Sequence, residues 1–128
     1  MTLFEQGDFT LHSGGKSKYR INCDVLTDSD LEMVAQVLTD RLPPFSEVHG
    51  IPRGGLRLAE IMKQHMMANA PNIVIVDDVW TTGRSMVELR EAMQANVDLG
   101  VCVYGAVIFQ RGIDQIPAWC VAFADIDI

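Results

Sequence analysis

Short apolar runs alternate with helical stripes along most of the chain. Runs that are apolar on both faces, or that alternate with polar residues, predict strands at 9–12, 19–23, 47–51, 73–76, 101–109 and 116–123. Apolar residues at helical spacing predict helices at 27–42, 56–68 and 85–96. This alternation favours an α/β fold with a mainly parallel, twisted sheet flanked by three helices. We expect the hairpin within 9–24 and the last strand to form a small hood beside that sheet.

The first predicted helix carries signals at its start and along one face. Thr27 is placed to cap it, and Asp30 lies near the positive end of its dipole. Its apolar stripe repeats at i, i+3, i+4, i+7 and i+11 and consists of Leu31, Val34, Ala35, Leu38 and Leu42. We predict that this helix is part of the scaffold.

Composition narrows the class of protein. A chain of 128 residues predicts one domain, 1–128, with a real core. A net charge of −7 argues against nucleic-acid binding by a general basic face. The cysteines Cys23, Cys102 and Cys120 are widely spaced, so neither a zinc site nor a disulfide framework is indicated. Without an apolar run of about 20 residues or the features of a signal peptide, we expect a cytoplasmic protein with no membrane partner.

The stretch 72–86 carries the strongest chemical signal. The β-branched run at 73–76 is typical of a buried parallel strand, and it ends at Asp77 and Asp78, where α/β sheets bind ligands. The following turn offers hydroxyls, N–H groups and a helix dipole, and it consists of Thr81, Thr82, Gly83, Arg84 and Ser85. Acids that bind hydroxyls or a metal, followed by an anion site, fit a phosphorylated sugar. The alternative is a buried strand before a capped helix, with both acids in solvent.

The residues VIVDDVWTTGRS in this stretch resemble the diphosphoribosyl-binding motif of type I phosphoribosyltransferases. The resemblance implies that Asp77 and Asp78 are the catalytic, metal-binding pair and hold the ribose 2′- and 3′-hydroxyls, partly through Mg²⁺. It also implies that the turn 81–85 binds the 5′-phosphate of 5-phosphoribosyl 1-diphosphate. Magnesium takes few carboxylates and keeps several waters, which fits so sparse a set of ligands.

A glycine-rich turn, GIPRGGL, joins the strand at 47–51 to the second predicted helix. Its glycines let the backbone approach a ligand closely, and Arg53 adds a planar, permanently charged donor for phosphate oxygens. The turn resembles the pyrophosphate loop of the same family, which implies that Arg53, Gly54 and Gly55 contact the pyrophosphate of the sugar donor. The alternative is a tight strand-to-helix turn with a solvated Arg53.

The amino-terminal hairpin resembles a signature near the start of orotate phosphoribosyltransferases. The matching residues are Phe9, Leu11, Ser13, Gly14 and Ser17, with Tyr19 close by. The resemblance implies that His12, where the family has a lysine, reaches the pyrophosphate, and that Tyr19 lies near the base. The alternative is that both side chains occupy ordinary hairpin faces.

The strand at 101–109 runs into Gln110 and Arg111, where orotate phosphoribosyltransferases have an aspartate followed by an arginine. The resemblance implies that Arg111 recognises the base. The alternative is that Arg111 pairs with a neighbouring acid such as Asp114. One family feature has no room here, because 67–72 leads almost directly into the central strand and replaces a long, basic, mobile loop.

These observations predict a shortened phosphoribosyltransferase that transfers 5-phosphoribosyl to a small nitrogenous base, most simply a pyrimidine such as orotate. The family commonly pairs, so we expect a homodimer. The missing loop favours the alternative, a non-catalytic regulatory protein that binds the donor or a nucleotide. A response-regulator-like domain is disfavoured, because no late-strand lysine in the expected order is evident.

Overall fold

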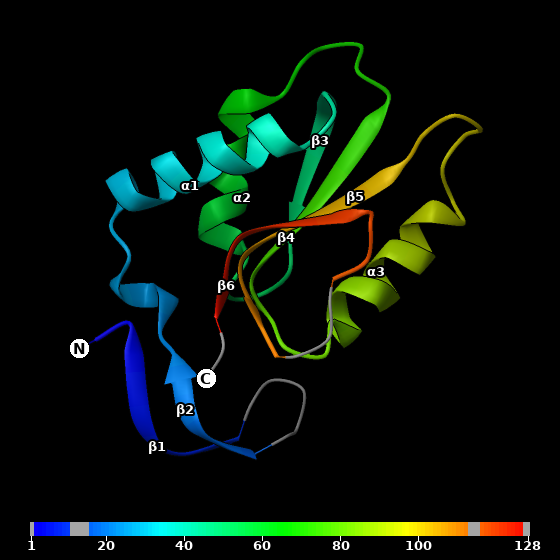
Figure 1. Cartoon of the computed structure of the whole chain (residues 1–128). Helices are drawn as coiled ribbons and strands as arrows, with labels where there is room; N and C mark the ends of the chain where they lie inside the picture. The colour runs from blue at the N-terminus through cyan, green and yellow to red at the C-terminus, as the bar shows by residue number, and fades with distance from the viewer. Residues whose placement is uncertain (1, 11–15, 113–115, 127–128) are drawn as a thin grey trace.

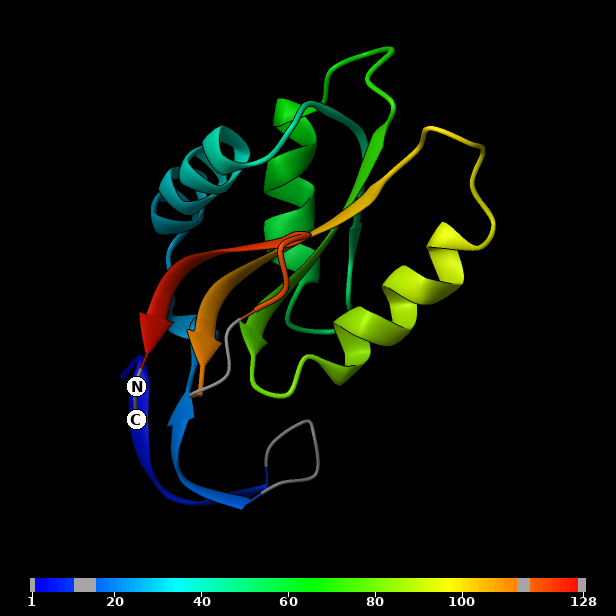
Figure 2. The same cartoon turned by 45° about the vertical axis from the view of Figure 1, so that its right-hand side comes forward.

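The computed structural model describes residues 2–10, 16–112 and 116–126, and a four-stranded parallel sheet forms its main body (Figure 1). The strands lie in chain order: β3 (Phe45–Gly50), β4 (Asn72–Trp80), β5 (Val103–Arg111) and β6 (Cys120–Ile126). Two helices, α1 (Asp28–Arg41) and α2 (Leu56–Met62), cover one face, and α3 (Arg84–Gln94) covers the other (Figure 2). The predicted α/β architecture is confirmed.

The side chains of β4 alternate between two hydrophobic cores. Val74 and Val76 pack with the buried residues of α1 and α2. Ile73 and Ile75 point to the other face and pack with Met86 of α3. Because helices cover both faces, every position of the run at 73–76 is apolar.

The helices follow the predicted signals, with one difference in length. Thr27 Oγ1 accepts a hydrogen bond from the Asp30 N–H at 3.1 Å, and Asp30 Oδ2 accepts one from the Thr27 N–H at 2.8 Å. These bonds hold the pKa of Asp30 below its usual value. The second helix ends earlier than predicted, at Met62, and a short 3₁₀ turn, η2 (Lys63–His65), follows it. Within the described residues, no helix is both long and apolar enough to cross a membrane.

The amino-terminal hairpin is a separate two-stranded antiparallel sheet made of β1 (Phe4–Thr10) and β2 (Lys16–Ile21). The predicted hairpin is confirmed, although β1 begins before position 9, and its register is irregular between Gln6 and Phe9. A 3₁₀ turn, η1 (Cys23–Val25), leads from the hairpin to α1. The hairpin lies near the carboxyl ends of the main strands in both views (Figures 1 and 2), and Phe4 contacts Phe109 with ring centroids 6.5 Å apart.

Two expectations about strands are wrong. The last strand does not join the hood, because β6 pairs in parallel with β5 and completes the main sheet. The central strand does not end before its acids, because β4 continues to Trp80 and Asp77 pairs with Val107 of β5. The apolar run stops at Val76, but Asp77 is still buried and backbone pairing continues to Trp80.

Candidate functional site

The two adjacent acids lie in the last third of β4, where the sheet approaches the hairpin. Asp77 is only 8% exposed, and its Oδ1 accepts a hydrogen bond from the backbone N–H of Asp78 at 2.8 Å. Asp78 Oδ1 accepts one from the N–H of Val79, also at 2.8 Å. Within the described chain, neither carboxyl forms an ion pair. Their remaining lone pairs are therefore available to a ligand.

Burial and the neighbouring Asp78 both disfavour a negative charge on Asp77. Burial raises the pKa of Asp77 to about 8, and the charge of Asp78 and a hydrogen bond between the two side chains contribute to the rise. Without a bound cation, this shift favours the protonated form of Asp77. Burial, followed by the charges of Asp78, Asp24 and Asp77, also raises the pKa of the Cys23 thiol to about 12. This thiol lies close to the acids and is not reactive as a thiolate.

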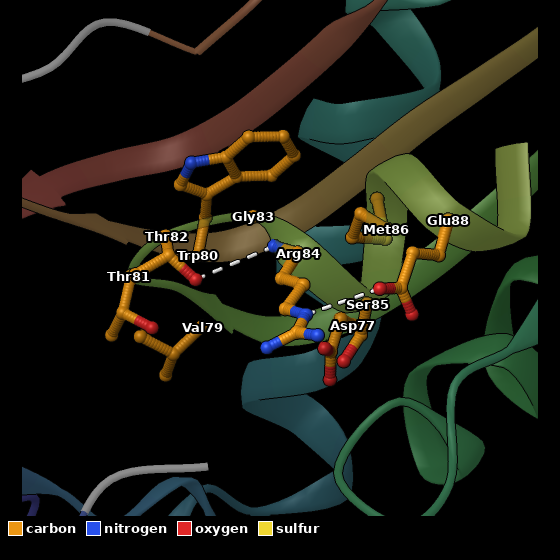
Figure 3. Close-up of a pocket in the computed structure, with 10 residues that line it drawn as sticks. All are labelled: Asp77, Val79, Trp80, Thr81, Thr82, Gly83, Arg84, Ser85, Met86 and Glu88. Atoms are coloured by element: carbon orange, nitrogen blue, oxygen red, sulfur yellow. Dashed lines mark hydrogen bonds and ion pairs between the residues drawn. The ribbon is translucent and has the colours of Figure 1, made fainter. Parts of the chain in front are cut away.

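The turn after β4 lines a cavity of about 280 Å³ (Figure 3). Asp77 contributes to the same cavity. All five residues predicted to bind a phosphate line it: Thr81, Thr82, Gly83, Arg84 and Ser85. α3 begins at Arg84, so its free backbone N–H groups and the positive end of its dipole lie beside these hydroxyls. The arrangement suits a phosphate group.

The shape of this turn depends on Gly83. Its φ is +76°, in the left-handed region that favours glycine. A Cβ at this position would lie inside the indole of Trp80, whose ring also packs edge-on against Trp119 at 5.8 Å. Arg84 Nε contacts Glu88 Oε1 at 3.1 Å in an exposed pair (Figure 3). Such pairs contribute little, so the Arg84 guanidinium can exchange this partner for an anion.

The glycine-rich turn between β3 and α2 lies directly against β4. The Ile51 N–H donates to the Val76 carbonyl at 2.8 Å, and the Gly55 N–H donates to the Ile51 carbonyl at 2.8 Å. A Cβ on Gly55 would collide with the Val76 carbonyl oxygen and lie 2.8 Å from the Ile51 nitrogen. Glycine at this position lets the turn come this close to the strand.

Gly54 brings the same turn into contact with the acids. A Cβ on Gly54 would lie 2.6 Å from Asp78 Oδ1. The neighbouring Arg53 is exposed, and its peptide bond with Pro52 is cis. The turn and the acidic pair, separated by more than twenty positions in the sequence, therefore form one continuous surface.

A second cavity, of about 170 Å³, lies between the acids and the hairpin. Its lining consists of Thr10, Arg20, Ile21, Asp77, Asp78, Val79, Thr81 and Arg111. Arg111 is 8% exposed, and its Nη2 donates to the Ser17 hydroxyl, which ties β5 to β2. The two cavities share Asp77, so this side chain lies between the phosphate-sized turn and the space beside the hairpin.

The structure brings most of the predicted residues to one edge of the sheet, but it places Tyr19 of the hairpin away from the two cavities. Tyr19 is 40% exposed and lies outside the lining of both cavities. Its neighbour Arg20, which sequence reasoning did not single out, lines the second cavity. Strand alternation could not have singled it out, because the adjacent residues Arg20 and Ile21 both line this cavity. His12 lies outside the described residues, so its role and that of Tyr19 stay predictions.

The expected shortness of the segment before β4 is confirmed. Residues 66–71 join η2 to β4 and contain neither lysine nor arginine. The Met67 N–H donates to the Phe45 carbonyl at 2.8 Å, which ties the segment to the start of β3. This end of the sheet is opposite the acids, so the segment has neither the length nor the charge to cover them.

The two acids can serve as magnesium ligands only together with other oxygen atoms. Within the described residues, no three His, Cys, Asp or Glu side chains are grouped to hold a metal by themselves. Magnesium needs only one or two carboxylates when water and phosphate oxygens complete its shell. Asp77 and Asp78 offer such a set, and a cation would offset the repulsion that contributes to the raised pKa of Asp77. The residues fit a magnesium ion that arrives with a phosphorylated ligand.

Comparisons with known proteins bear on the fold. Neither a protein-family model nor a curated protein sequence matches this chain. Among solved structures, orotate phosphoribosyltransferase from Aeropyrum pernix has a TM-score of 0.71 at 24% identity, over 96% of this chain and 88% of that one. Orotate phosphoribosyltransferase from Mycobacterium tuberculosis H37Rv, in complex with Fe(III) dicitrate, has a TM-score of 0.67 at 17% identity, over 96% and 89%.

A third neighbour acts on different bases according to its name. Xanthine-guanine-hypoxanthine phosphoribosyltransferase from Helicobacter pylori has a TM-score of 0.59 at 14% identity, over 79% of this chain and 83% of that one. All three identities are below 25%, so the likeness concerns the path of the backbone. As its sequence motifs predicted, this chain has the α/β fold of the type I phosphoribosyltransferases.

Proposed function

We propose that this chain is a phosphoribosyltransferase. It transfers the 5-phosphoribosyl group of 5-phosphoribosyl 1-diphosphate to a ring nitrogen of a base, most simply a pyrimidine such as orotate, and releases pyrophosphate. The observation that carries the proposal is the position of Asp77 in the lining of both cavities. A ribose held at Asp77 has a phosphate site on one side and a space for the acceptor on the other.

Each part of the donor has a matching set of groups. The 5′-phosphate fits the turn 81–85 and the N-terminus of α3. The ribose hydroxyls meet Asp77 and Asp78, and the pyrophosphate extends toward the turn 53–55, where Gly54 abuts Asp78. The base enters the second cavity, where Arg111 is the predicted recognition residue.

The proposed reaction depends on stabilisation of charge by the protein and does not need a nucleophilic side chain. The bond from carbon 1 to the base nitrogen forms as the bond to pyrophosphate oxygen breaks, and the sugar becomes positively charged between them. Asp77 and Asp78 lie where that positive charge develops, while N–H donors and Arg53 meet the negative charge that grows on pyrophosphate. Bound Mg²⁺ would supply further positive charge at the pyrophosphate.

A second candidate is a protein that binds the donor or a nucleotide without turnover and regulates a partner. The segment 66–71 favours it, because it provides no basic cover over the site. Transferases of this kind profit from excluding water during the reaction. Tight donor binding without pyrophosphate release for any base would select this second function.

Pyrophosphate release separates the two functions. The assay contains Mg²⁺, the donor and a panel of bases that includes orotate, uracil and hypoxanthine, and we expect release with orotate. Replacing Asp77→Asn together with Asp78→Asn should weaken donor binding about tenfold or more, because each lost charged hydrogen bond contributes about 1.5–3 kcal/mol. The matched control, Asp40→Asn with Asp98→Asn, makes the same two substitutions at exposed positions. Unchanged donor affinity in the Asp77→Asn, Asp78→Asn variant would contradict the assignment of the ribose hydroxyls to these two acids.

We also propose that the chain works as a homodimer, as the resemblance implies, and that it lies in the cytoplasm, as its composition led us to expect. Light scattering on the purified chain tests the first point, with a mass near 28 kDa expected, about twice the 14.2 kDa of one chain. A monomer at micromolar concentration would contradict the proposed homodimer. Imaging of the tagged chain in its host cell tests the second.

A further inference from the structure

The turn 81–85 lies directly against the indole of Trp80. This residue ends β4, is only 6% exposed and lines the first cavity (Figure 3). A Cβ on Gly83 would lie 1.9 Å from Cζ2 and 2.2 Å from Cε2 of the ring, so the Gly83 backbone already touches the indole. The place of this ring therefore sets the place of the turn.

Trp119 holds that indole from a different part of the chain. It belongs to the turn before β6, and its ring centre lies 5.8 Å from that of Trp80 at an interplanar angle of 62°. Edge-to-face contacts of this kind favour one relative orientation of the two rings. Both indoles pack with Met86 of α3 in the core on that face of the sheet. Trp119 does not line the first cavity, so its effect on a ligand there is indirect.

Trp119 is itself held on two sides. Arg90 of α3 places its guanidinium carbon 4.7 Å from the centre of the Trp119 ring, and Arg90 Nε donates to the Val103 carbonyl at 2.7 Å. The Gly105 N–H donates to the Trp119 carbonyl at 2.8 Å, and a Cβ on Gly105 would lie 2.9 Å from Trp119 Cζ3. Gly105 thus binds the backbone of Trp119 and leaves room for its ring.

These contacts form a closed path around the turn. The path runs from Arg90 through Trp119 and Trp80 to Gly83, and Arg90 belongs to the same helix, α3, that begins at the turn. The turn is therefore restrained by the chain on both of its sides. Restraint of this kind reduces the conformational freedom that the turn would lose when a ligand binds.

We propose that Trp119 is a positioning residue for the phosphate site. Acting through Trp80, it holds the turn 81–85 in the conformation that accepts a phosphate group. This inference rests on the proposed function for the identity of the ligand. A role in the scaffold alone makes a different prediction, because replacing Trp119 would then lower stability and leave phosphate affinity unchanged.

The test is calorimetry with ribose 5-phosphate, and with inorganic phosphate as a smaller probe, at a temperature where each variant is folded. Trp119→Leu should bind both probes about tenfold more weakly, because a displaced turn loses the equivalent of about one charged hydrogen bond. Trp119→Phe keeps an aromatic ring against Trp80 and beneath Arg90, so its affinity should stay within about threefold.

Two further variants separate positioning from stability. Val34→Ala removes buried methyl groups from the core on the opposite face, so it should lower Tm and keep ribose 5-phosphate affinity within about twofold. Arg90→Gln removes the cation over the Trp119 ring and leaves both indoles, so it should weaken ribose 5-phosphate binding by about two- to fivefold. This variant decides the question if Trp119→Leu does not fold.

Three results would overturn the inference: unchanged affinity in folded Trp119→Leu, unchanged affinity in Arg90→Gln, or an equal loss in Val34→Ala. Failure of the proposed function has a different signature. A chain that releases no pyrophosphate with any base, yet binds ribose 5-phosphate in a way that depends on Trp119, would keep the positioning role and lose the transferase. A chain that binds neither probe would lose both.

Discussion

Replacing Asp77 by asparagine removes a carboxyl whose pKa is raised by the fold and leaves a side chain of the same shape. The pKa of Asp77 is raised from 3.8 to about 8, mainly by burial. Between these two pH values the folded chain binds a proton that the unfolded chain has released. Folding stability therefore falls as the pH rises through this window, at a rate of at most about 1.4 kcal/mol per pH unit.

The magnitude follows from the width of the window. From pH 5 to pH 7 the titration of Asp77 lowers the free energy of unfolding by up to about 2.7 kcal/mol. Asp77→Asn has no carboxyl to titrate at this position. Its free energy of unfolding, relative to that of the unaltered chain, should therefore rise by this amount from pH 5 to pH 7. For a domain of this size, 1 kcal/mol corresponds to about 4 °C, so the difference in Tm should widen by up to about 10 °C.

This difference is measured by thermal unfolding of the unaltered chain and of Asp77→Asn at pH 5, 6 and 7. A chelator is present to exclude divalent cations. Other titrating groups are common to the two proteins and cancel in the comparison. Asp98→Asn is the matched control, because Asp98 is exposed in the segment after α3 and its difference from the unaltered chain should stay constant. A Tm difference for Asp77→Asn that stays flat or narrows toward pH 7 would refute the reasoning, since Asp77 would then be ionised in the folded chain.

Three further substitutions test the scaffold and the site separately. Gly83→Ala should lower the free energy of unfolding by about 2–4 kcal/mol in a urea titration, because alanine is strained at positive φ and its methyl group overlaps Trp80. Gly54→Ala should weaken donor binding about tenfold in calorimetry with little change in Tm, because Gly54 is exposed and its added methyl group displaces the Asp78 carboxylate. Thr27→Ala should lower the free energy of unfolding by about 1 kcal/mol without changing donor affinity, because it removes only a helix cap.

The central part of the site was predictable because its signals are local. A β-branched run specifies a strand buried on both faces, and a glycine before a helical stripe specifies where the helix begins. Parallel strands bring their carboxyl ends to one edge of the sheet, so Gly54 and Asp78 meet there although they are far apart in sequence. The end of β4 was misplaced, because the apolar run stops at Asp77 although this acid is buried and pairs with Val107.

The hairpin side was less predictable because its geometry is not local. The register of β1 and β2 is irregular between Gln6 and Phe9. Such an irregularity changes which side chains face a given surface, and no residue type in this segment marks it unambiguously. Whether Tyr19 or Arg20 reaches the acids therefore depends on how the whole hairpin packs against β5, through contacts such as that of Arg111 with Ser17. The order of β6 in the sheet is likewise set by packing rather than by its own pattern.

The distribution of charge is compatible with the proposed binding of an anionic sugar by a chain with a net charge of −7. Several cations, such as Arg57 and Lys63, pair with acids on the helices, away from the site. Within the described residues, Arg53 and Arg111 have no acid partner, and both lie at the carboxyl edge of the sheet. Negative charge elsewhere acts through water and is screened beyond about 10 Å, whereas these donors act at contact distance. Local donors without an acid partner therefore support the proposed anion binding, and the overall charge does not oppose it.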